Sequence, residues 1–82
     1  MTGIERISGP WRGYWVAAYT VEFDEHCVGY AKICLQRPDT VWDNAFQFLK
    51  VSYEGFHHEE ALAGVEAVAR TTIVRLQQLS LF

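Results

Sequence analysis

The sequence predicts an α+β domain, in which a three-stranded antiparallel sheet (β-β-β-α order) carries one long C-terminal helix packed on one face. Three segments, residues 13–23, 27–36 and 45–53, are rich in the β-branched and aromatic residues that strands favour. From residue 58 to residue 78, apolar residues recur at helical spacing instead. Strand signals followed by one helical signal are typical of a small two-layer domain.

The boundaries of these elements follow from the residues between them. Asp24-Glu25-His26 is a short polar tip that suits a hairpin between the first two strands. Arg37-Pro38-Asp39 ends the second strand, because proline has no N–H to donate to a sheet. Residues 1–10 lack periodicity and end in Ser8-Gly9-Pro10, so we expect a flexible N-terminal arm before a single domain at residues 11–82.

Alternation along the strands predicts which face is covered by the helix. Ala31, Ile33 and Leu35 share one face of the second strand, and Val16 and Ala18 are favoured for the same face of the first. In the third strand, the corresponding set is Leu49, Val51 and Tyr53. One helix covers one sheet face, so the opposite face is predicted to be aromatic and open.

The predicted helix runs from about His58 to Gln78, with Glu59 and Glu60 at the positive end of its dipole. At roughly 1.5 Å per residue it spans about 31 Å, which matches a strand of nine or ten residues at about 3.3 Å each. Its core-facing stripe comprises Leu62, Val65, Ala69, Thr72, Ile73, Leu76 and Leu79.

The back of this helix is small and uncharged where a solvated face would carry charge. Gly64 in a helix interior costs about 1 kcal/mol relative to alanine, which a closely approaching backbone would offset. Glu66 and Arg70 are placed to form an i,i+4 ion pair at the edge. The back face is either a seam for a second helix or simply a solvated surface of good helix formers. Its residues are Ala63, Gly64, Ala67, Thr71 and Val74.

A second possible association surface is the predicted open sheet face, which carries aromatic residues. A partner protein or a second copy of the chain would cover them. Alternatively, Tyr30 and Phe48 would stack single-stranded RNA bases beside Lys32 and Lys50. A third interpretation is an ordinary hydrophobic cluster shielded by Trp42 and the arm. The aromatic residues in question are Trp15, Tyr30, Phe46 and Phe48.

Composition argues against several classes of protein. The net charge is −3 and the seven basic residues are scattered, which makes nucleic-acid binding an unfavoured alternative. No apolar run approaches the ~20 residues of a membrane span, and the N-terminus lacks signal-peptide features. Cys27 and Cys34 would point to opposite faces of one strand, about 23 Å apart at ~3.3 Å per residue, so they cannot pair. Reduced thiols in a cytoplasm fit best.

No pattern for catalysis or metal binding stands out. His57 and His58 are adjacent, whereas two metal ligands on one helix face need a spacing of three or four. Neither a serine elbow nor a phosphate-binding glycine loop is found in the sequence. We therefore expect a non-enzymatic protein with no catalytic residues, metal, cofactor or small-molecule substrate.

Two motifs resemble known groups of proteins. Trp11-Arg12-Gly13-Tyr14 and Gly55-Phe56-His57-His58-Glu59-Glu60-Ala61 resemble segments of small uncharacterised bacterial β-β-β-α proteins, a likeness that implies a fold but no role. More distantly, the passage into the helix resembles HicB-like antitoxins, whose partial RNase H-like domain has three strands and a Glu-Glu-Ala helix. This chain lacks their Pro-Gly-Cys stretch.

The leading hypothesis is thus an interaction or oligomerisation module of a bacterial cytoplasm, most simply a homodimer joined by helix backs, open sheet faces or both. Single-stranded nucleic-acid binding and an antitoxin-like inhibitor are the alternatives.

Overall fold

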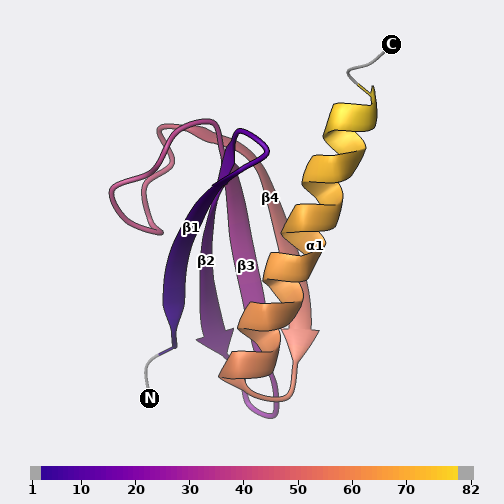
Figure 1. Ribbon diagram of the computed structural model, residues 1–82. Helices are drawn as coiled ribbons and strands as arrows, with labels where there is room; N and C mark the ends of the chain where they lie inside the picture. The colour runs from indigo at the N-terminus through magenta and orange to yellow at the C-terminus, as the bar shows by residue number, and fades with distance from the viewer. Residues whose placement is uncertain (1–2, 80–82) are drawn as a thin grey trace.

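The computed structural model describes residues 3–79, so residues 1–2 of the predicted arm and 80–82 of the predicted domain lie outside it. The prediction of an α+β fold with an antiparallel sheet and one C-terminal helix is confirmed, but the sheet has four strands, not three (Figure 1). The strands lie side by side in chain order. The elements are β1 (Glu5–Trp11), β2 (Tyr14–Glu22), β3 (Cys27–Cys34), β4 (Gln47–Gly55) and α1 (His58–Leu79).

The additional strand, β1, occupies most of the segment expected to be a flexible arm. It pairs antiparallel with β2, with Glu5 opposite Tyr19. The turn that joins the two strands is Arg12-Gly13, and both residues have positive φ angles, 52° and 86°. A two-residue turn with two positive φ values matches the twist of a hairpin. The Trp11-Arg12-Gly13-Tyr14 motif is therefore a hairpin turn rather than the start of the domain.

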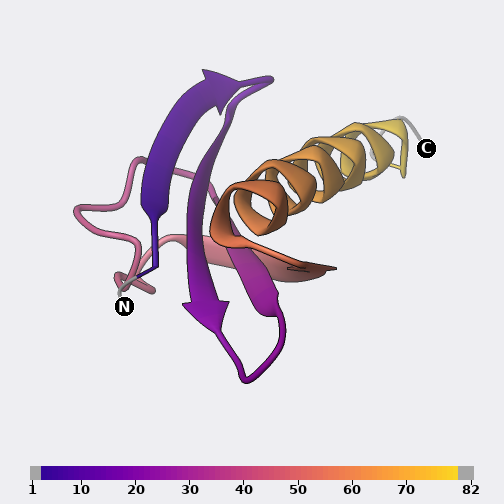
Figure 2. The same ribbon diagram turned by 90° about the horizontal axis from the view of Figure 1, so that it is seen from below.

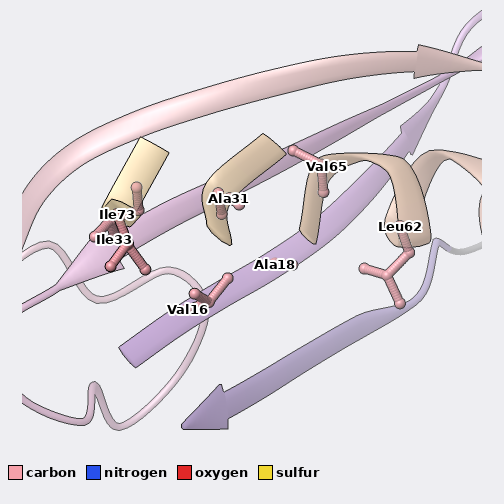
Figure 3. Close-up of a cluster of buried hydrophobic side chains, with 8 residues drawn as sticks. Val16, Ala18, Ala31, Ile33, Leu62, Val65 and Ile73 are labelled. Carbon is pink, nitrogen blue, oxygen red and sulfur yellow. The ribbon is translucent and has the colours of Figure 1, made fainter. Parts of the chain in front are cut away.

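One hydrophobic core lies between α1 and the sheet (Figure 3). The predicted inner faces of β2 and β3 are confirmed there for Val16, Ala18, Ala31 and Ile33, which meet the predicted helix stripe. Leu35, Leu49 and Tyr53, also predicted for this face, are instead exposed. Leu79, at the end of that stripe, is instead exposed. The buried residues of this core are Val16, Ala18, Ala31, Ile33, Leu62, Val65, Ala69 and Ile73.

The start of α1 rests directly on the sheet backbone. Gly29 of β3 lies under Ala61, and a Cβ at position 29 would be 2.9 Å from both the Ala61 carbonyl carbon and Val65 Cγ1. Ordinary carbon contacts are about 3.5–4.0 Å, so no side chain fits between β3 and the helix at position 29. The helix is thereby held close to β3 and β4.

An ion pair between a half-exposed arginine and a buried glutamate connects α1 to the first strand. The guanidinium of Arg6 donates to both carboxylate oxygens of Glu66, at 2.6 and 3.0 Å, and the Glu66 side chain is only 7% exposed. A bidentate, charge-assisted pair of this kind is among the stronger polar contacts. Glu66 thus pairs across 60 residues of sequence with β1, and not with Arg70 as its helical spacing predicted.

The second sheet face is not open as predicted, because the connection between β3 and β4 covers part of it (Figure 2). Val41 of this connection is buried against Ala17 and Tyr19, and Trp42 lies 4.6 Å from the Tyr19 ring. The ammonium of Lys32 donates to Asn44 Oδ1 at 2.6 Å and fastens the connection to the sheet. A second, smaller hydrophobic cluster therefore fills this side.

Candidate association surface

The sheet has two edge strands, and they differ in how well they are protected. On β1, Pro10 lacks an N–H, and the pairing register shifts between Ser8 and Trp11. Proline and bulges are devices that blunt an edge against further pairing. On β4, pairing with β3 is continuous from Leu49 to Gly55. Among residues 3–79, no strand pairs with the outer edge of β4.

An irregularity at the start of β4 changes the predicted position of Phe48. The register shifts where Ile33 pairs with Leu49 and Cys34 pairs with Gln47, so Phe48 is the additional residue. The Phe48 ring lies 6.4 Å from the ring of Tyr14, which packs on the core beneath α1. Phe48 therefore lies on the helix side of the sheet and not on the far side with Lys50, as alternation had predicted.

Exposed apolar side chains are concentrated along β4 and its flanks. Phe56 is 84% exposed and Phe48 is 53% exposed, large fractions for aromatic side chains. Exposed apolar side chains that gather in one patch are typical of an interaction site. The exposed apolar residues of this stretch are Phe46, Phe48, Leu49, Tyr53 and Phe56.

A shallow groove of 430 Å³ runs between β4 and the flank of α1. The packing at its floor explains why residue 64 is a glycine, because a Cβ at that position would overlap the ring of Tyr53. The close approach that the glycine permits is thus made by a side chain of the same chain. The groove is lined by Tyr53, Gly64, Ala67, Val68, Thr71, Thr72 and Arg75. Three of the predicted helix-back residues, Gly64, Ala67 and Thr71, therefore adjoin the unpaired edge.

Lys50 is the one basic residue of β4, and its side chain turns back over its own sheet. Its ammonium lies 5.0 Å from the centre of the Tyr30 ring and 5.7 Å from that of Tyr19. These are cation–π distances. A lysine on an edge strand discourages pairing when it extends across the edge, and Lys50 does not. Lys50 therefore does not protect the outer edge of β4 against pairing with another strand.

The other predicted site residues do not join this surface. Trp15 lies beneath the guanidinium of Arg37 at 5.5 Å, and Tyr30 stacks on Tyr19 at 5.4 Å, both on the far face. Ala63 is exposed and Val74 is half-buried, and neither lines the groove. The structure also separates the residues of the alternative RNA site, which are Tyr30, Phe48, Lys32 and Lys50. Lys32 is only 4% exposed, and Phe48 lies on the opposite face of the sheet from Tyr30.

A series of polar side chains in contact at the start of α1 was not indicated by any sequence pattern. The Thr20 hydroxyl and His58 Nδ1 are 2.7 Å apart, and His58 Nε2 lies 3.4 Å from Glu22. A hydroxyl, an imidazole and a carboxylate in this order resemble a nucleophile with its base. The Thr20 hydroxyl, however, is buried and accepts the N–H of Ile4 at 2.9 Å. Its evident role is to join the chain before β1, β2 and the helix start.

The two cysteines are buried, and burial raises the pKa of both thiols. A raised pKa keeps a thiol protonated and weakly nucleophilic. In the part of the chain that is described, no three side chains of His, Cys, Asp or Glu are grouped to hold a metal ion.

No family model matches the chain, and neither a curated protein nor a solved structure matches it significantly. Over the described residues, α1 is not apolar enough to serve as a membrane-crossing helix.

Proposed function

We propose that this protein is a non-enzymatic association module that forms a homodimer through the outer edge of β4 and the adjoining flank of α1. The observation that carries the proposal is the unpaired β4 edge, which is bordered by exposed Phe48, Tyr53 and Phe56 and by the groove beside Gly64. An edge with these properties binds another strand unless it is guarded.

The size of the domain favours such an association. A chain of about 80 residues buries only about 60% of the surface its unfolded state exposes, and oligomerisation is a common means of stabilising it. Half of the exposed large apolar side chains in the described part of the chain lie on or beside β4, next to the groove on α1. A second copy supplies the same apolar edge, so both edges are covered at once.

The position of the helix is compatible with pairing of two β4 strands. α1 packs more extensively on β3 and β4 than on β2. If strands are about 4.8 Å apart, a helix centred between β3 and β4 lies about 5 Å from a two-fold axis beside β4. Two such helices are then about 10 Å apart, close to the 8–10 Å of packed helices. At that spacing, the small residues on the α1 flank suit the contact.

The variant Ala67→Glu tests the proposal. It places a carboxylate on the exposed flank of α1 that adjoins β4, so we expect the homodimer to dissociate at least tenfold more readily. The helix itself should remain folded, because glutamate is a good helix former and Ala67 is exposed. Sedimentation equilibrium over a range of concentrations measures the dissociation constant.

Gln36→Glu is the matched control, because it adds the same charge at an exposed position of the connection that follows β3, outside β4 and the groove. We expect this variant to dimerise like the wild type. Equal dimerisation of Ala67→Glu and the wild type would place the contact elsewhere.

A further inference from the structure

The sequence of β4 has a self-complementary charge pattern that specifies how two copies would align. We propose that the β4 strands of two copies pair antiparallel with Ser52 on the two-fold axis, so that Lys50 of each copy lies opposite Glu54 of the other. This inference rests on the proposed function, to which it adds the register and the charge pairs.

The geometry of the pairing limits the possible registers. Two identical antiparallel strands in one sheet are related by a two-fold axis perpendicular to it, which passes beside one residue of each strand. Residues opposite each other then project to the same face. Both helices consequently lie on one face of a continuous sheet, and each register is named by the residue on the axis.

Comparison of the registers singles out Ser52. An axis at Lys50 places two ammonium groups opposite each other, and an axis at Glu54 does the same for two carboxylates. With the axis at Val51 or Tyr53, neither Lys50 nor Glu54 meets an opposite charge. With the axis at Ser52, two Lys50–Glu54 pairs form, one on each side of the axis. Opposite-charge pairs directly across two strands are favourable, and like pairs are unfavourable.

The two charged groups are free to meet in this register. The Glu54 side chain is 74% exposed, and its closest described polar contact is with His26 at 3.3 Å. Lys50 reaches the Tyr19 and Tyr30 rings on the same far face through a long, flexible side chain. Cross-strand Cβ atoms are about 4.5–5.5 Å apart, which brings the ammonium within reach of the opposing carboxylate.

The same register brings together the helix-side features. Val51 lies opposite Tyr53 of the other copy, and both residues project toward the helix layer. Tyr53 packs on Gly64, so Gly64 lies close to the axis. The two helices thus flank the axis at the level of Gly64, with the Tyr53 ring of each copy packed against its own helix.

Exchange of the charges tests the register. We expect Lys50→Glu and Glu54→Lys each to weaken self-association by on the order of tenfold or more at low salt, because each variant opposes like charges on both sides of the axis. An equimolar mixture of the two should recover the dimer mass, because every pair in the mixed dimer is complementary. The double variant K50E/E54K should self-associate like the wild type. Sedimentation equilibrium measures each of these.

The outcomes separate the register from the proposed function. A wild-type dimer whose affinity is unchanged in both single variants, with no gain on mixing, overturns the register and leaves the β4 homodimer standing. A wild type that is monomeric at all concentrations overturns both. If a charge-reversal variant does not fold, Lys50→Gln and Glu54→Gln replace it in the same measurement. Each should weaken the dimer a few-fold, and no weakening in either would contradict the register.

Discussion

Gly29→Ala is expected to destabilise the domain by about 3 kcal/mol, the upper part of the range for overpacking a close-packed core. The added methyl group would overlap the backbone oxygen of Ala61 and lie 2.9 Å from its carbonyl carbon. Backbone atoms at a helix start cannot move aside as a side-chain end can, so α1 would have to lift from β3. Urea unfolding followed by circular dichroism measures the change.

Gly64→Ala is the matched control for this prediction. Its added methyl group overlaps the Tyr53 ring, which is 40% exposed and able to swing outward. Alanine also favours the helix by about 1 kcal/mol over glycine. We therefore expect a net change of less than about 1 kcal/mol for this variant. A loss of similar size in both variants, or none in Gly29→Ala, would contradict the close packing of α1 on β3.

Ser52→Lys is expected to abolish dimerisation at micromolar concentrations while the fold is retained. With Ser52 on the two-fold axis, the substitution places two ammonium groups directly opposite each other, and it restores a basic guard to an edge strand. Ser52 is exposed, so the change buries no charge within one copy. Sedimentation equilibrium reports the mass, and circular dichroism reports the fold.

Gln36→Lys adds the same charge on the exposed connection and should leave dimerisation unchanged. If Ser52→Lys dimerises as tightly as Gln36→Lys, the two β4 strands do not face each other at this residue.

The parts of the fold that could be predicted from sequence are those set by local patterns. The predicted bounds of β2, β3, β4 and α1 lie within two residues of the observed ones at every end, because alternation and helical periodicity are properties of the segments themselves. β1 was missed because its hairpin turn is Arg12-Gly13, which lacks the Asn-Gly or Asp-Gly signal of such turns.

Long-range contacts and irregular segments could not be predicted from the pattern of residue types along the chain. Alternation placed Phe48 on the far face because a bulge in β4 leaves no mark in the sequence around it. Glu66 pairs with Arg6, and Lys32 donates a hydrogen bond to Asn44. These are tertiary contacts that no rule of sequence spacing predicts. The covering of the far face by Val41 and Trp42 likewise depends on the path of an irregular connection.

The candidate site was predicted in part. The small residues Gly64, Ala67 and Thr71 were selected for their lack of charge, and the structure places them beside the unpaired edge. That edge itself was not recognised, because which strand is outermost depends on the strand order. Once β4 is known to be an edge, its Lys50-Ser52-Glu54 pattern becomes informative.

The most direct measurement is the mass of the wild-type protein by sedimentation equilibrium at low salt, from micromolar to near-millimolar concentration. The β4 homodimer predicts a concentration-dependent rise to twice the 9.4 kDa of one chain. A mass that stays at that of one chain throughout the range would contradict it.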